Sequence, residues 1–130
     1  MMLSDMERVI ASFRRCSADC EFMDHFYQRF MESSPQVTAK FARVDMDHQA
    51  VMMRGSLEMM LQGSLHPNGL TALAELHSRR GIGISPSLYD LWLDSLLSTV
   101  RAYDDECGEE LLAAWRRVLL PGIQAMAQSY

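Results

Sequence analysis

A histidine stands at the end of a short apolar pattern in the second half of the chain. Leu70, Leu73 and Leu76 recur at helical spacing and lead into His77. A neutral imidazole is a good ligand for a metal ion, but a histidine on an apolar helix face also packs into a core without any ligand. The helix by itself favours the core histidine. Any role of His77 as a ligand therefore depends on partners elsewhere in the chain.

A second candidate is a glutamine that interrupts an apolar helical stripe. The stripe follows the spacing i, i+3, i+4, i+7 and consists of Met46, Gln49, Ala50, Met53, Leu57, Met60 and Leu61. Gln49 is its one polar member, so we predict that its amide faces the interior. The alternative is a helix register shifted by one residue, which makes Gln49 a boundary residue and places His48 on the inner face.

Sulfur-containing side chains are the remaining candidates. Cys16 and Cys20 are four residues apart, a spacing that suits a thiol switch or half of a metal site. No further Cys or His nearby completes a ligand set, so we predict small apolar packing for both. Cys107 makes the count odd, as expected for reduced thiols in a cytosolic protein. The eleven methionines could provide an iron ligand or an oxidation sensor, and core filling is the favoured reading.

The elements that must position these residues are all helices. No run of alternating β-branched residues bounded by turns is present, which excludes a sheet. Ser4 and Glu7 form a capping-box pattern, and Ser85 is expected to cap a helix whose first turn contains Pro86. Pro121 is expected to kink or break the last helix. The predicted helices cover 5–17, 19–33, 45–62, 70–79, 86–100 and 109–126, with a short turn over 35–41 and a polar break over 104–108.

Composition limits the class of protein. The chain has 130 residues, of which 48% are hydrophobic and 22% charged, as in an ordinary folded domain. A net charge of -5 and the absence of a basic stripe make nucleic acid an unexpected partner. Apolar runs are far shorter than the roughly 20 residues of a membrane span, and the first residues lack the pattern of a secretory signal. We therefore expect a cytoplasmic protein without a membrane partner.

An ordered set of residues along the chain points to a family. The set consists of Phe26, Tyr27, Pro35, Phe41, Gln49, the segment 76–80, the segment 86–89, Ala114 and Trp115. With these residues at these distances, the chain resembles the bacterial single-domain globins from about Met6 to Met126. The resemblance implies one globin domain over 1–130, an all-α globin fold of about six to eight helices, and one bound haem b (iron protoporphyrin IX).

The resemblance also implies roles around the haem. His77 matches the proximal histidine that ligates iron and leaves the opposite axial position for a gas. Tyr27 matches a position whose hydroxyl points into the ligand pocket, with Gln49, or His48 in the shifted register, as a second donor; the alternative for Tyr27 is a hydroxyl at the surface. Phe41 is expected to stack on the porphyrin, and Met53 to press near the bound gas.

On the side of the haem that faces His77, several residues have alternative expected roles. Arg79 and Arg80 either pair with haem propionates or are exposed cations at a helix end. Ile84 is expected against the haem, with Ile82 as an alternative, and Tyr89 completes the lining. Flavohaemoglobins carry a glutamate in the last helix that acts on the proximal histidine, and no Asp or Glu follows Glu110 here. We therefore expect no such relay, and His25 and His66 to be solvated.

The implied function is reversible binding of dioxygen or another diatomic gas, NO or CO, at the iron. An enzymatic alternative is nitric oxide dioxygenation with a separate reductase as partner. A third possibility is a globin-fold sensor or interaction module that has lost haem. The chain is expected to be a monomer or a homodimer, and a binding protein in preference to an enzyme.

Overall fold

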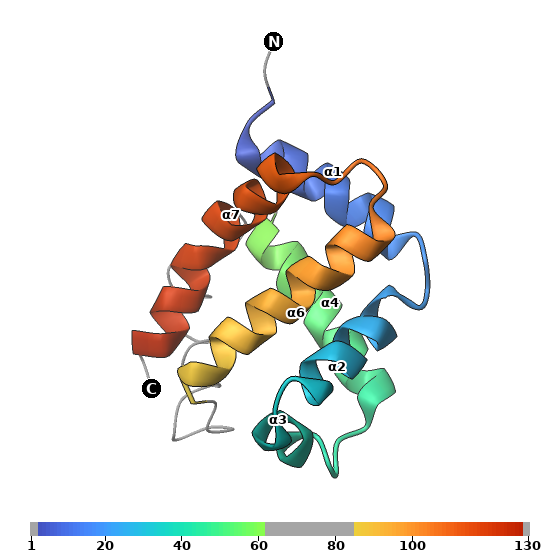
Figure 1. Ribbon diagram of the computed structural model, residues 1–130, viewed down its shortest axis with the longest axis vertical. Helices are drawn as coiled ribbons and strands as arrows, with labels where there is room; N and C mark the ends of the chain where they lie inside the picture. The colour runs from blue at the N-terminus through green and yellow to red at the C-terminus, as the bar shows by residue number, and fades with distance from the viewer. Residues whose placement is uncertain (1–2, 62–84, 129–130) are drawn as a thin grey trace.

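The polypeptide is helical throughout the part that the structure, a computed structural model, describes: residues 3–61 and 85–128 (Figure 1). No strand occurs in these two ranges. The helices are α1 (Asp5–Ser17), α2 (Phe22–Glu32), α3 (Pro35–Lys40), α4 (Met46–Leu61), α6 (Ser87–Tyr103) and α7 (Glu109–Gln128). The helix predicted over 70–79 lies outside the described residues, as do His66, His77, Arg79, Arg80, Ile82 and Ile84.

The first two helices show how local chemistry fixes their ends. At α1 the predicted capping box is present: the Glu7 N–H donates to Ser4 Oγ, and the Ser4 N–H donates to Glu7 Oε1. Helix α2 starts at Phe22, three residues later than predicted. Asp19 instead accepts a hydrogen bond from the Glu21 N–H at 2.9 Å, and this local turn competes with an earlier helix start.

One prediction about a proline is corrected, and a second is narrowed. Helix α6 starts at Ser87 with Pro86 at its N-cap, so Ser85 does not cap it; the Ser85 hydroxyl lies 3.1 Å from the hydroxyl of Ser87. Helix α7 runs through Pro121 without a broken turn. Because Pro121 has no N–H, the carbonyl of Arg117, four residues earlier, lacks its usual donor within the helix. Both residues are exposed, so water can satisfy that carbonyl.

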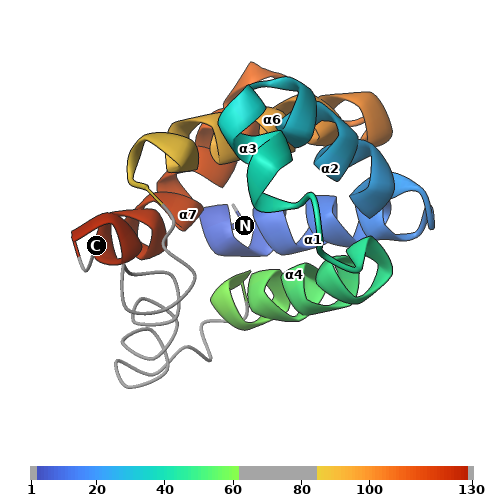
Figure 2. The same ribbon diagram turned by 90° about the horizontal axis from the view of Figure 1, so that it is seen from below.

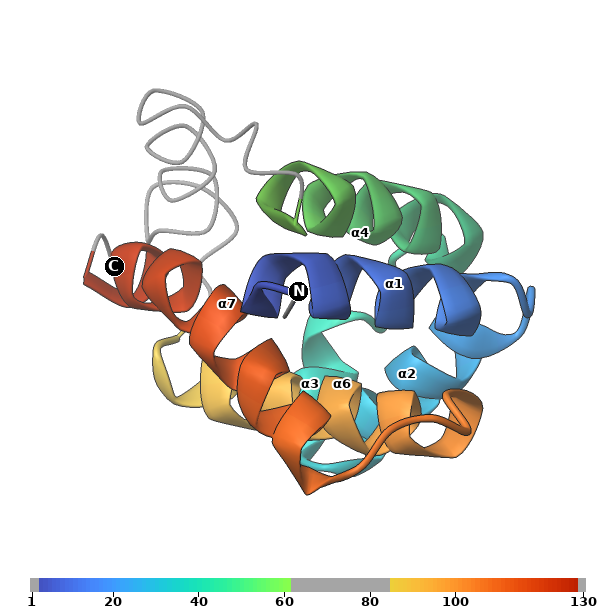
Figure 3. The ribbon, with the colours of Figure 1, turned by 90° about the horizontal axis from the view of Figure 1, so that it is seen from above.

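The helices pack in crossed pairs around one hydrophobic core. Helices α2 and α6 cross and share aromatic contacts, while α1 lies beside both α4 and α7 (Figures 2 and 3). The largest side chains that are fully buried come from all six described helices, and they include Val9, Phe22, Phe26, Val37, Leu57, Leu96, Trp115 and Leu119. Burial of such apolar surface is the main favourable term in folding.

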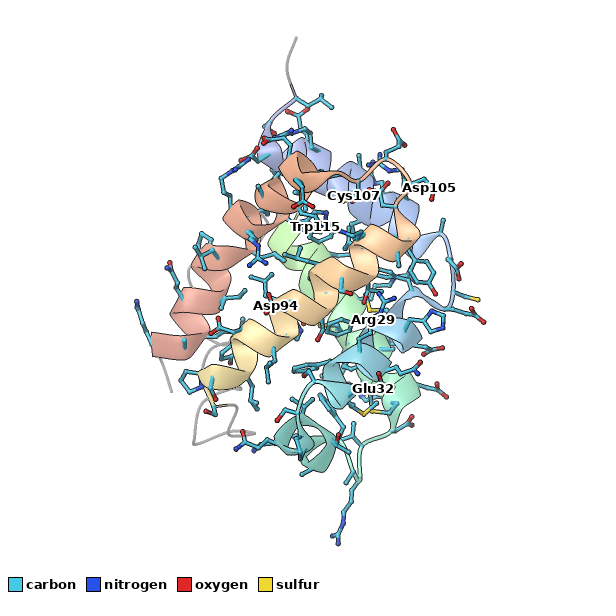
Figure 4. The ribbon with its side chains drawn as sticks, viewed as in Figure 1. Arg29, Glu32, Asp94, Asp105, Cys107 and Trp115 are labelled. Atoms are coloured by element: carbon cyan, nitrogen blue, oxygen red, sulfur yellow. The ribbon has the colours of Figure 1, made fainter. Side chains whose placement is uncertain are left out.

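A buried polar network joins the two ends of the chain. Asp104, directly after α6, is 1% exposed and accepts hydrogen bonds from Arg15 Nε at 2.7 Å and Ser12 Oγ at 2.6 Å. Trp115 Nε1 donates to Ser12 Oγ at 3.0 Å. Figure 4 shows Trp115 where α1, α6 and α7 meet. The break predicted at 104–108 is therefore not simply a solvated loop, because its first residue anchors α6 and α7 to α1.

No helix in the described ranges is long and apolar enough to cross a membrane.

Candidate functional site

The candidate site is centred on a tyrosine inside the helical core. Tyr27 lies on α2 and is 4% exposed. Its position follows from the spacing of α2, which directs Phe22, Phe26 and Phe30 inward, with Tyr27 beside Phe26 on the side of the helix that faces α4. The alternative in which its hydroxyl reaches the surface is not observed.

Tyr27 and Gln49 are held together by two hydrogen bonds. Gln49 Nε2 donates to the Tyr27 hydroxyl at 3.3 Å, and that hydroxyl donates to the main-chain oxygen of Gln49 at 3.4 Å. The second bond is long, and helix geometry already gives the Gln49 carbonyl an N–H one turn further on. The phenol proton is therefore available to a better acceptor.

The surroundings keep this hydroxyl neutral. Burial raises the pKa of Tyr27 to about 12, and the hydrogen bond from Gln49 opposes this only in part. Tyr27 consequently remains a hydrogen-bond donor throughout the physiological pH range.

An aromatic and aliphatic wall surrounds the pair. Phe41 caps the C-terminus of α3, with its ring 5.5 Å from that of Tyr27 and 6.0 Å from that of Phe30. Phe41, Met46, Ala50 and Met53 are only half-buried and pack against the core. An apolar surface with one hydrogen-bonding pair suits a mostly apolar ligand with a small polar group that the pair can bond.

Helix α4 presents Gln49 rather than His48 to this wall. His48 is exposed, and its N–H donates to Asp45 Oδ1 at 3.3 Å in the first turn of α4. Leu57 and Leu61, further along the predicted stripe, are both buried. The register without a shift is therefore the one that the structure has.

A second buried tyrosine, Tyr89, lies in the first turn of α6. Tyr89 is 6% exposed, and its hydroxyl has no hydrogen-bond partner among the described residues. Burial raises its pKa to about 12. An unpaired buried hydroxyl costs about 1–3 kcal/mol, and a bound group that accepts its hydrogen bond would remove this cost.

Comparison with known proteins identifies the family. A solved structure from Pseudomonas aeruginosa, described as a protein structurally highly homologous to a human haemoglobin, matches with a TM-score of 0.94. The two chains are 40% identical, and the match covers 98% of each. The chain belongs to this haemoglobin-like family. Searches against protein-family models and against curated proteins find no match for this globin-like chain.

This match confirms the all-α globin fold predicted from the sequence. In the globin-like chain, Tyr27, Phe41 and Gln49 come together, and Met53, one helical turn after Gln49 on α4, is half-buried and packs against the core. Tyr89 is buried, and His48 is exposed and apart from this group. The predicted haem contacts at His77, Arg79, Arg80 and Ile84 fall outside the described residues and stay predictions.

The described residues of the globin-like chain contain no group of three or more His, Cys, Asp or Glu side chains that could hold a metal ion. Haem iron does not require one, because the porphyrin supplies four nitrogens and a single protein ligand is enough.

Two predictions about polar side chains are wrong: His25 is not solvated, and Cys20 is not packed in the core. His25, expected to be solvated, is half-buried, and its Nδ1 is hydrogen-bonded to the hydroxyl of Tyr103 across α2 and α6. The signal was its place on α2 between the inward Phe22 and Phe26. The packing predicted for Cys16 is confirmed, but Cys20 is exposed, because it lies in the turn after α1.

The hollow beside this turn is not the candidate site. It lies between the 17–24 segment and α4, has a volume of about 170 Å³ and is lined by Cys20, Val51 and Arg54 among others. This volume is below the roughly 300 Å³ at which ordinary ligand pockets begin.

Proposed function

We propose that the protein is a haem-binding globin that reversibly binds dioxygen or another diatomic gas. The observation that carries the proposal is the Tyr27–Gln49 pair, a hydrogen-bonding couple at 3.3 Å in an otherwise apolar wall of a haemoglobin-like fold. When bound, haem b would supply the iron that a gas molecule ligates.

The described residues that would hold the haem come from the end of α3, from α4 and from α6. Phe41 and Met53 offer half-buried apolar surface next to Tyr27, and Tyr89 offers a buried hydroxyl that lacks a partner among the described residues. These three fit the group. The residues proposed from the family resemblance are His77 as the iron ligand, Arg79 and Arg80 at the propionates, and Ile84 against the ring.

In this proposal the protein side chains bind the iron-bound gas by hydrogen bonding and exclude water from it. With haem and gas bound, the Tyr27 hydroxyl would donate a hydrogen bond to the gas in place of the long bond to the Gln49 carbonyl, and Gln49 Nε2 would keep the phenol oxygen oriented. A low dielectric strengthens such hydrogen bonds. A tyrosine donor that Gln49 holds in place should slow the release of dioxygen, which suits scavenging or sensing better than delivery.

The test is haem binding followed by absorption spectroscopy. The purified chain is titrated with haemin, and spectra are recorded in the ferric, ferrous and CO-bound forms. We expect a Soret band at one haem per chain, and reversible changes with dioxygen and CO. If no Soret band is present in protein from cells with adequate haem and none develops on titration, the proposal is wrong.

A matched pair of variants tests the iron ligand. His77→Ala should abolish stable haem binding, whereas His48→Ala should retain it because His48 is exposed on α4. Equal haem affinity in the two variants would remove His77 from the site while leaving the haem proposal intact.

A further inference from the structure

The first half of α4, which carries Gln49, is fixed in the fold by little burial. No residue of α4 before Leu57 is buried, whereas Leu57 and Leu61 are each 1% exposed. Val51 and Met52, which follow Gln49 closely, are 70% and 47% exposed. Packing of an apolar face is what normally holds a helix in place. The position of Gln49 must therefore depend on other interactions.

One aspartate organises the first turn of α4. Asp45 directly precedes the helix, and its Oδ1 accepts hydrogen bonds from the N–H groups of Asp47 at 3.1 Å and His48 at 3.3 Å. Its main-chain oxygen accepts a hydrogen bond from the Gln49 N–H at 2.9 Å, the first bond of the helix. Asp45 is therefore the N-cap of α4, and its carboxylate satisfies two of the N–H groups that a helix start leaves without partners.

Asp45 also connects two parts of the candidate site along the chain. It lies midway between Phe41, at the end of α3, and Gln49. The Val44 N–H donates to the main-chain oxygen of Phe41 at 3.2 Å, so the connection from α3 to α4 is a tight turn (Figure 2). The N-cap consequently fixes where α4 begins relative to Phe41.

The effect of Asp45 on the pocket is indirect. Its side chain is exposed, whereas Gln49 contacts the Tyr27 hydroxyl both through Nε2 at 3.3 Å and through its main-chain oxygen at 3.4 Å. The main-chain oxygen has this position only while the first turn of α4 is helical, and the direction of the Gln49 side chain depends on the same backbone. Fraying of that turn therefore displaces both contacts together.

We propose that Asp45 is a positioning residue of the ligand pocket, which holds Gln49 against Tyr27 by capping α4. The inference rests on the proposed function, in which the Tyr27 hydroxyl bonds the gas. Without the cap, the first turn of α4 opens more often and Gln49 orients the phenol for a smaller fraction of the time. The bound gas is then released faster.

The first measurement is made on the full chain without haem. Hydrogen exchange of the Gln49 N–H, followed by NMR, reports how often the first turn of α4 opens. Asp45→Ala should lower the protection of this N–H about 5- to 30-fold, the range that the loss of a helix N-cap corresponds to. Asp47→Ala removes the same charge from the same turn but keeps the acceptor, and should lower the protection less than about threefold. Asp45→Asn should retain most of it, because asparagine caps helices about as well as aspartate.

The second measurement is dioxygen release from the haem-loaded chain, followed by stopped-flow displacement with CO. Asp45→Ala should accelerate release about 2- to 5-fold, and no more than Gln49→Leu does, because it acts through Gln49. In a chain that already carries Gln49→Leu, it should add nothing. Asp45→Asn should release dioxygen at close to the rate of the wild type.

The two measurements separate this proposal from the proposed function. Unchanged protection of Gln49 in Asp45→Ala, or an equal loss in Asp47→Ala, would overturn the positioning role whether or not the chain binds haem. Absence of haem binding would overturn the proposed function and leave the exchange result intact. Lowered protection with unchanged dioxygen release, or an additive effect in the Gln49→Leu chain, would make Asp45 a helix cap without a role in the pocket.

Discussion

The hydroxyl of Tyr27 lies between two groups of the same residue, 3.3 Å from the side-chain nitrogen of Gln49 and 3.4 Å from its main-chain oxygen. The two residues are 22 positions apart and belong to α2 and α4. This contact joins the two helices at the candidate site and assigns the phenol both an acceptor and a donor role.

Tyr27→Phe should leave the fold and haem binding intact and accelerate dioxygen release. Hydrogen bonds with one charged or partly charged partner are worth about 1.5–3 kcal/mol, which corresponds to about a 10- to 100-fold higher dissociation rate. Stopped-flow displacement of dioxygen by CO measures this rate. An unchanged rate would take Tyr27 out of the ligand pocket.

Gln49→Leu should have the same effect to a smaller extent, about 3- to 10-fold, because the amide acts partly by orienting Tyr27. His48→Leu is the matched control, since the neighbouring residue on α4 is exposed. The same displacement experiment compares the two variants. A larger effect from His48 than from Gln49 would contradict the helix register described above.

Tyr89→Phe should stabilise the haem-free chain. The hydroxyl is buried without a partner among the described residues, and its removal should raise the free energy of unfolding by about 1 kcal/mol. In the haem-loaded chain the gain should shrink or reverse if the hydroxyl then has a partner. Thermal unfolding followed by circular dichroism measures both forms. Tyr103→Phe is the control, because it removes a hydroxyl that is bonded to His25, and it should destabilise the chain.

Asp104→Asn should destabilise the fold at neutral pH by about 1.5–3 kcal/mol, since hydrogen bonds from Arg15 and Ser12 converge on the carboxylate. Burial by itself would raise the pKa of Asp104, but the hydrogen bonds from Arg15, Ser12 and the Glu106 N–H outweigh it and lower that pKa.

The sign of the pH dependence follows from that lowered pKa. A carboxyl group with a lower pKa in the folded state stabilises the fold above the unfolded value of about 4, and this stabilisation is lost as the pH falls through the folded value. Urea unfolding at several pH values should therefore show the Asp104→Asn difference narrowing below about pH 4. Asp105→Asn, at the exposed neighbouring position, should differ little from wild type at any pH. A constant difference down to pH 2 would contradict an ionised Asp104.

Much of the fold could be predicted because its causes are local. The capping box of Ser4 and Glu7 and the polar break after Tyr103 act within a few residues, so the helices lie close to their predicted ranges. The exceptions are helix starts at which two local structures compete and the sequence pattern does not show which is more stable. Examples are the turn at Asp19 and the position of Pro86 at the start of α6.

The sequence by itself determined that the chain is all-α, that either Gln49 or His48 lies on the inner stripe of its helix, and that a globin was the family to expect. Only the tertiary structure decided that Gln49 and not His48 faces the Tyr27 hydroxyl, and that Asp104 is buried under Arg15. The physical reason is distance along the chain. Helical periodicity reports which face of one helix is apolar, but the contacts of Tyr27 with Gln49 and of Trp115 with Ser12, which are 22 and 103 positions apart, depend on how the helices pack.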